Sequence, residues 1–233
     1  MNIFNLFKKK VVKPSAPLTI DELSQLIINR LYTANDEFIR GYELIKKYPR
    51  SVSILGSARF KPDNIYYKQA ESLAARIVRE LNYAVVTGAG PGIMEAANKG
   101  AFQAGGKSLG FAIKLPNEQK VNDYLTEYVE FEYFFSRKTL LFFSAETYIY
   151  YPGGFGTMDE LFEILTLIQT KEIPRVPVIL VGREFWTPLL KLIDDTLYHE
   201  ANTINLEDQS IYKIVDNEEE IIEIIRNAPF RQE

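Results

Sequence analysis

Residues 84–92, AVVTGAGPG, join a short apolar run to a glycine-rich turn, and an amphipathic segment from Gly92 to about Ala104 follows them. An apolar run without polar alternation is typical of a strand that is buried on both faces of a sheet. Glycine in the turn and helical spacing after it predict a strand, a tight turn and then a helix. This unit is the building block of an α/β fold.

The same order recurs along the chain on both sides of this unit. Further apolar runs lie at Val52–Leu55, Leu109–Ile113, Tyr148–Tyr151 and Val178–Val181, with a weaker one at Tyr212–Val215. Amphipathic segments lie at Tyr66–Leu81, Ser136–Glu146, Thr157–Thr170 and Pro188–Tyr198. Right-handed crossovers then predict a doubly wound, mainly parallel, Rossmann-like sheet. Ligands of such sheets bind beyond the carboxyl ends of the strands, so the turns directly after the runs are the places to search for a site.

The N-terminal region has a different pattern. Residues 11–18, VVKPSAPL, predict a linker, and Thr19 with Glu22 predicts a capping box at the start of a helix. Helical periodicity continues to Tyr48, and we expect an interruption near Thr33–Asn35. We therefore expect residues 1–48 to form a tail and helical extension that packs on the main domain or on a partner subunit. Residues 49–233 are expected to form the Rossmann-like domain.

Composition excludes several classes of function. The 233 residues include no cysteine, which excludes disulfides, thiolate metal sites and a cysteine nucleophile. A net charge of −4 gives no electrostatic reason to expect nucleic-acid binding. No apolar run approaches the ~20 residues of a membrane span, and MNIFNLFKKK has its apolar and basic parts in the reverse order of a secretory signal. We expect a cytoplasmic protein with neither a nucleic-acid nor a membrane partner, and a solvated terminus around Lys8–Lys10.

Three turns that follow apolar runs combine glycine with a helix start. They are residues 55–59 (LGSAR), residues 87–95 (TGAGPGIME) and residues 151–160 (YPGGFGTMDE). Backbone amides of a glycine turn at a helix N-terminus form an anion site, which phosphate commonly occupies. The second turn alone is a weak signal, because a dinucleotide fingerprint would need glycine at Ile93 and would follow the first strand. A tight turn without a ligand is an equal alternative for it.

The third turn is more specific. Its motif Pro152-Gly-Gly-Phe-Gly-Thr157-x-x-Glu160, with Arg137-Lys138 at the start of the preceding helix, resembles the LONELY GUY family from about Ser51 to Tyr198. Members of that family are cytokinin riboside 5′-monophosphate phosphoribohydrolases, long labelled lysine decarboxylases. The resemblance implies that Arg137 and Glu160 are catalytic and that the protein is a homodimer or a higher homo-oligomer. It implies a phosphate-binding loop of Gly153, Gly154, Gly156 and Thr157, and we add Ser57, Gly88, Gly90, Gly92, Glu95 and Lys138 as candidate substrate contacts.

The residues themselves support the same chemistry. Cleavage of a ribosyl N–C bond builds positive charge on the sugar, which a nearby carboxylate stabilises while it orients water. Arginine suits the neighbouring position because its planar fork binds oxyanions. Together with the resemblance, this chemistry leads us to expect an AMP nucleosidase-like N-glycosidase that converts a nucleoside 5′-monophosphate, AMP or an N6-substituted analogue, to free base and ribose 5-phosphate. Many plant-like members read GGGxxGLMG where this chain has Glu95, a departure that is expected to alter the wall of the pocket and with it the preferred base. No cofactor and no metal are required.

Each candidate also has a structural alternative. Thr157 and Glu160 have the spacing of a capping box, Glu95 could complement a helix dipole, and Arg137 could pair with Glu132 at the surface. The aromatic cluster between Tyr128 and Phe135 is expected in the core or at a subunit interface rather than against a base, and His199 is expected to cap a helix end.

Two other functions remain open from the sequence. One is a non-catalytic nucleotide-binding module. The other is a pyridoxal phosphate-dependent lysine decarboxylase, for which Lys138 is the candidate Schiff-base lysine near the glycine turns.

Overall fold

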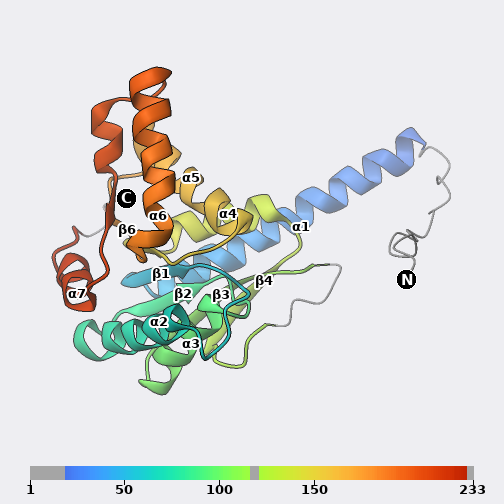
Figure 1. The fold of residues 1–233 in the computed structure, drawn as a ribbon. Coiled ribbons are helices and arrows are strands. Elements are labelled where there is room, and N and C mark those ends of the chain that lie inside the picture. The colour runs from blue at the N-terminus through green and yellow to red at the C-terminus, as the bar shows by residue number, and fades with distance from the viewer. Residues whose placement is uncertain (1–18, 116–120, 230–233) are drawn as a thin grey trace, which may run out of the picture.

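The computed structural model describes residues 19–115 and 121–229, which contain a seven-stranded sheet with every neighbouring pair parallel. The strands are β1 Ser51–Leu55, β2 Ala84–Thr87, β3 Ser108–Ile113, β4 Glu127–Phe131, β5 Thr147–Tyr150, β6 Val178–Leu180 and β7 Tyr212–Ile214. Their order is β4-β3-β2-β1-β5-β6-β7. The chain runs outward from β1 to β4, returns to β5 beside β1, and runs outward again to β7 (Figure 1). The topological switch point therefore lies between β1 and β5.

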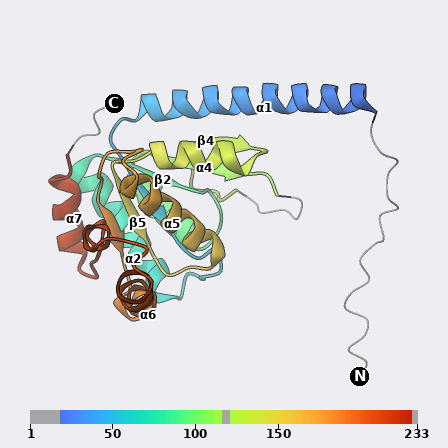
Figure 2. The same ribbon diagram turned by 90° about the horizontal axis from the view of Figure 1, so that it is seen from above.

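Helices cover both faces of the sheet (Figures 1 and 2). The helices are α1 Ile20–Lys47, α2 Ile65–Arg76, α3 Ile93–Gln103, α4 Phe134–Phe143, α5 Phe155–Gln169, α6 Arg183–Leu192 and α7 Glu218–Arg226. A π-helical segment extends α2 (η2, Ile77–Leu81) and another extends α6 (η3, Ile193–Glu200), and a short 3-10 helix precedes β7 (η4, Leu206–Ser210). The predicted doubly wound Rossmann-like fold is confirmed.

Alternation along the strands divides the core into two layers. Tyr148 and Tyr150 point to the layer that α1, α4, α5 and α6 cover, whereas Ile149 and Tyr151 point to the layer under α2, α3 and α7. Successive side chains of a strand face opposite sides of a sheet, so an uninterrupted apolar run supplies both layers at once.

One strand and one helix were not predicted. β4, with the sequence EYVEF, alternates between buried and exposed residues because it is the edge strand beside β3. Only Val129 and Phe131 of this strand are buried, so it lacks the continuous apolar run of the central strands. The acidic start of α7, Glu218–Glu220, precedes its apolar residues and is capped by Asn217.

The N-terminal helix has nearly the expected bounds and is more regular than expected. The predicted capping box is confirmed, since the Thr19 hydroxyl accepts from the Glu22 amide at 3.2 Å and the Glu22 carboxylate accepts from the Thr19 amide at 2.8 Å. The predicted interruption near Thr33–Asn35 is wrong: α1 is continuous, and Thr33 donates its hydroxyl to the Asn29 carbonyl within the helix. The linker predicted at 11–18 and the terminus around Lys8–Lys10 lie outside the described residues.

The second half of α1 packs on α4 and on edge strand β4. The contact is close at Gly41, where an added Cβ would lie 2.3 Å from the Leu140 side chain. Glu37 of α1 is fully buried there and accepts hydrogen bonds from the Glu132 amide and the Ser136 hydroxyl at the start of α4. Across residues 19–115 and 121–229, no helix combines the length and apolar character needed to cross a membrane.

Candidate active site

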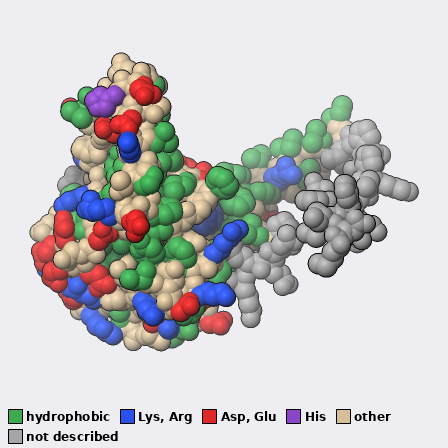
Figure 3. All heavy atoms as spheres, viewed as in Figure 1, with side chains coloured by type: hydrophobic (Ala, Val, Ile, Leu, Met, Phe, Trp, Pro, Cys, Tyr) green, Lys and Arg blue, Asp and Glu red, His purple; other side chains and the backbone are tan. Residues whose placement is uncertain are grey.

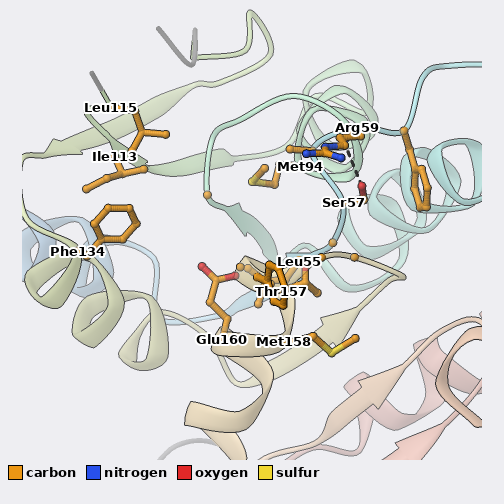
Figure 4. Close-up of a pocket in the computed structure, with 18 of the residues that line it drawn as sticks. Leu55, Ser57, Arg59, Met94, Ile113, Leu115, Phe134, Thr157, Met158 and Glu160 are labelled. Carbon is orange, nitrogen blue, oxygen red and sulfur yellow. Dashed lines mark hydrogen bonds between the residues drawn. The ribbon is translucent and has the colours of Figure 1, made fainter. Parts of the chain in front are cut away.

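A cavity of about 900 Å³ opens at the carboxyl ends of β1, β2 and β5, at the switch point of the sheet (Figure 4). Its wall includes eight of the predicted site residues: Ser57, Gly88, Arg137, Gly153, Gly154, Gly156, Thr157 and Glu160. The turns after β1 and β5 are tied together across the switch point, because the Ser57 amide donates to the Pro152 carbonyl at 3.0 Å. Segments that are distant in sequence therefore contribute to one cavity.

Arg137 of α4 and Glu160 of α5 form an ion pair in this wall. Arg137 Nη1 donates to Glu160 Oε1 at 3.1 Å, and Arg137 Nε donates to the Phe111 carbonyl at 2.8 Å. The two side chains are only 8% and 12% exposed. Burial raises the pKa of the Glu160 carboxyl, and the Arg137 charge opposes that rise. The carboxyl group of Glu160 is therefore largely shielded from water, although it lines the cavity.

The contacts of Arg137 and Glu160 exclude the structural alternative for each of them, a surface ion pair and a capping box. Glu132, the proposed surface partner of Arg137, lies 3.6 Å from Lys114 instead. Helix α5 begins at Phe155 with Gly154 as its N-cap, and no side chain caps it. Thr157 is thus inside the helix, and Glu160 points toward Arg137 rather than back to the helix start, so the capping box does not form.

The first turn of α5 has the geometry of an anion site. The opening amides of a helix have no partner within it, and no side chain supplies one here. An added Cβ at Gly154 or Gly156 would meet nothing within 4 Å, so backbone rather than side chain faces the cavity. Amides at the positive end of the helix dipole are suited to a phosphate. We name residues 151–157 the β5 turn.

The turn after β2, residues 88–92, serves a different purpose, and we name it the β2 turn. An added Cβ at Gly92, where φ is +73°, would lie 2.2 Å from the Ser57 carbonyl oxygen. An added Cβ at Gly88 would lie 2.4 Å from Arg137 Nη2. The Gly90 carbonyl accepts from Asn122 at 3.1 Å. Of these glycines only Gly88 lines the cavity, and the candidate substrate contacts Gly90 and Gly92 lie outside its wall.

Glu95 and Lys138 also lie outside the wall of the cavity. Glu95, in the first turn of α3, accepts from the Tyr67 hydroxyl at 2.8 Å, consistent with complementing the helix dipole. Lys138 is ion-paired with Asp159 and Glu163 on the surface of α5. Within the described residues no lysine lines the cavity.

Sequence reasoning missed one charged residue of the site. Arg59 lines the cavity, and its amide donates to Ser57 Oγ at 3.1 Å. In the part of the chain that the structure describes, no carboxylate lies within 4.0 Å of its side chain, so Arg59 is the unpaired cation of a wall in which Arg137 is matched by Glu160. Its place, directly after the first strand, is the signal that could have identified it.

An apolar side of the cavity was missed as well. Figure 4 shows Ile113, Leu115 and Phe134 together on one side, Ser57 and Arg59 on the other, and Glu160 between them. The predicted aromatic cluster is thus divided: Phe131 is in the core, Phe134 lines the cavity, and Phe135 is 57% exposed. His199 lies on η3, outside the wall, with its Nε2 3.7 Å from Asp194.

The fold and the site define a Rossmann-like α/β protein with an open glycine turn at a helix start beside a buried Arg–Glu pair. The family described as possible lysine decarboxylase matches residues 94–225, more than half of the chain, and the chain belongs to this family. The LONELY GUY resemblance found in the sequence is thereby confirmed.

A curated relative and two solved structures refine the comparison. The cytokinin riboside 5′-monophosphate phosphoribohydrolase of Rhodococcoides fascians is 28% identical over 151 residues, which are 63% of this chain and 75% of the relative. The molybdenum cofactor binding protein of Rippkaea orientalis is 24% identical, with a TM-score of 0.55 over 76% of this chain and 93% of that one. The molybdenum cofactor carrier protein of Chlamydomonas reinhardtii is 18% identical, with a TM-score of 0.56 over 77% and 97%. The relative supports an enzyme at the level of the family, and the two structures show the shared fold.

Proposed function

We propose that this protein hydrolyses the N-glycosidic bond of a nucleoside 5′-monophosphate, AMP or an N6-substituted analogue, to free base and ribose 5-phosphate. The buried Arg137–Glu160 pair beside the open β5 turn carries the proposal. The name of the Rhodococcoides fascians relative supports the same reaction.

The two sides of the cavity orient the substrate. The 5′-phosphate binds the opening amides of α5, with Thr157 and Ser57 nearby, and Arg59 supplies the unpaired positive charge. The base extends toward the apolar side formed by Ile113, Leu115 and Phe134. The ribose then lies against Glu160, between the two. An apolar side of this kind accepts either a bare purine or one with an apolar N6 substituent.

In this orientation Glu160 acts on the developing charge of the sugar. As the C1′–N bond breaks, the base leaves with the bonding electrons and takes up a proton, and the ribose becomes an oxocarbenium ion. The Glu160 carboxylate stabilises that ion and orients a water molecule, whose oxygen bonds to C1′ as it loses a proton. The Arg137 charge opposes the rise that burial causes in the pKa of Glu160, and its hydrogen bond fixes the position of the carboxyl group.

The test is a panel of nucleotides analysed by chromatography. Purified protein is incubated with AMP, N6-substituted AMP and other nucleoside monophosphates, and free base and ribose 5-phosphate are measured in equal amounts. A Glu160→Gln variant is the control for contaminating nucleosidases. Tight binding of a nucleotide with no release of base from any member of the panel would instead identify a non-catalytic nucleotide-binding module.

Among the residues that the structure describes, nothing in the site supports the lysine decarboxylase alternative. Lys138 is the candidate Schiff-base lysine, but it lies outside the cavity and is held by two carboxylates. A homo-oligomer remains our expectation for the quaternary structure.

A further inference from the structure

The first half of α1 extends away from the body of the protein. Figure 2 shows the helix passing well beyond the sheet, and the buried residues of α1 begin only at Ala34. We name residues 20–32 the free half and residues 34–47 the docked half. Large apolar side chains of the free half are between 38% and 83% exposed; they are Ile20, Leu23, Leu26, Ile27, Ile28, Leu31 and Tyr32. Figure 3 shows hydrophobic side chains over this projecting part.

One apolar stripe runs through both halves. Leu23, Ile27 and Leu31 continue, at spacings of three or four residues, into Ala34 and Phe38 of the docked half. That spacing keeps the side chains on one face of a helix. In the docked half this face packs on α4 and β4. The free half carries the same face with nothing among the described residues to cover it, so its sequence is suited to a second surface of the same kind.

An exposed aromatic surface lies beside the docked half. Phe38 stacks on Tyr42 with ring centroids 6.4 Å apart, and Phe135 of α4 lies at the same distance from Phe38. Tyr42 remains 46% exposed and Phe135 57% exposed. Contiguous exposed apolar surface of this kind is typical of a protein–protein contact.

The dimensions of the two halves match. At about 1.5 Å per residue, the free half and the docked half each span about 20 Å. A two-fold axis near residue 33 would therefore place the free half of each copy beside the docked half of the other. A two-fold interface of this type uses the same surface twice.

The charges at the ends of α1 favour an antiparallel arrangement. Asp21 lies in the first turn and Lys46 in the last, and neither has an ion pair among the described residues. The neighbouring Lys47 is already paired with Glu127 at 2.8 Å. In an antiparallel pair, Asp21 of each copy lies next to Lys46 of the other, so two complementary contacts form.

From the stripe, the aromatic surface, the equal lengths and the end charges, we propose that a second copy of this chain covers the free half of α1. The two α1 helices lie antiparallel and side by side, and each free half packs on Tyr42 and Phe135 of the other copy. The interface borders the candidate active site, because Phe134 of the cavity wall adjoins Phe135.

The first experiment measures oligomeric state and its charge dependence. Sedimentation of the full-length chain is expected to give twice the mass of one chain. Asp21→Lys and Lys46→Asp should each raise the dimer dissociation constant about tenfold or more, and the double variant should restore it. Glu172→Lys, an exposed charge reversal on the body, is the matched control and should leave it unchanged. A monomer, or a double variant no tighter than the singles, would overturn the proposal.

A second experiment tests the antiparallel geometry, using the absence of cysteine from the chain. Asp21→Cys and Lys46→Cys proteins are mixed, allowed to exchange, and oxidised. The mixture should form a disulfide-linked dimer, whereas each variant alone should not. If instead the Asp21→Cys protein alone forms a disulfide-linked dimer and the mixture forms no mixed dimer, the two helices are parallel. A dimer that gives no crosslink in the mixture would place the interface elsewhere, and either result contradicts the proposal.

Discussion

The β2 turn and the β5 turn both place glycines between a buried strand and a helix, but Gly92 of the first turn is used in the opposite way to Gly154 and Gly156 of the second. Gly153 of the β5 turn resembles Gly92, because an added Cβ there would clash with the Thr157 side chain. At Gly92 a side chain would meet the Ser57 backbone at 2.2 Å, so glycine there lets two segments of the protein touch. At Gly154 and Gly156 a side chain would meet nothing within 4 Å, so glycine there leaves room beside backbone amides. The spacing of glycines alone does not distinguish a turn that packs against the protein from a turn that binds a ligand. The two are distinguished by what a side chain at each glycine would contact.

The sharpest test of this comparison pairs Gly92→Ala with Gly154→Ala. Gly92 combines φ of +73° with a backbone clash, so its replacement should lower the free energy of unfolding by about 4 kcal/mol or more. Gly154 has φ of −95° and open space, so its replacement should change that free energy by less than about 0.5 kcal/mol. Denaturant titration measures both. Gly154→Ala should still weaken binding of ribose 5-phosphate, and equal destabilisation by the two changes would remove the distinction between the turns.

Glu160→Gln tests the role of the carboxylate on α5, the helix that begins in the β5 turn. The amide keeps the shape of the side chain and removes its charge, so kcat should fall about a hundredfold or more, roughly 3 kcal/mol of transition-state stabilisation. Affinity for AMP and the melting temperature should change little. A folded Glu160→Gln protein with wild-type kcat would remove Glu160 from the mechanism.

The pH profile adds a signature of the same residue. Burial raises the pKa of Glu160, and the mechanism needs its ionised form. The rate should therefore rise with pH through a pKa above the ordinary glutamate value, and Glu160→Gln should lack that rise.

The substrate's own phosphate gives the next largest effect. If the β5 turn binds it, AMP should be cleaved about a hundredfold better than adenosine in kcat/KM, since at least two charge-assisted hydrogen bonds are lost with the phosphate. Binding of the remote phosphate also holds the ribose against Glu160, so kcat should fall as well. Ribose 5-phosphate should compete with AMP. Equal kcat/KM for the two substrates would mean that the open glycines serve another purpose.

The smallest effect is expected from Arg59. Its guanidinium adds one exposed charge to a site that backbone amides already form, so Arg59→Ala should lower kcat/KM for AMP about tenfold. Arg59→Lys should retain part of the activity. The Arg59→Ala variant and the unmodified protein should cleave adenosine, which lacks the phosphate, at equal rates. Lys61→Ala, an exposed cation two residues further on and outside the cavity wall, is the matched control. The same loss in both variants would indicate a general charge effect.

The central sheet could be predicted because its signal is local. β1, β2 and β3 are buried on both faces, which requires continuous apolar runs that stand out from the amphipathic helices. Edge strand β4 has one covered face, and its two glutamates interrupt the apolar pattern. The interruption expected at Thr33–Asn35 is absent because the Thr33 hydroxyl bonds within the helix.

The site could be predicted in part for a related reason. The motif residues Arg137 and Glu160 are brought together by the fold as expected. Whether a glycine faces a cavity or a neighbouring backbone depends on segments distant in sequence, and Ser57 decides it for Gly92. Arg59 and Leu115 lie in irregular segments after strands, where no periodicity indicates the direction of a side chain.

Glu37 connects the N-terminal helix to the catalytic candidate Arg137. Its buried carboxylate accepts hydrogen bonds from the Glu132 amide and the Ser136 hydroxyl. Ser136 directly precedes Arg137 at the start of α4. A protein truncated at residue 48 would leave these donors and the start of α4 without their acceptor. The N-terminal extension thus supports the position of Arg137 from a distance. A domain boundary placed at residue 48 from the sequence pattern would remove that support.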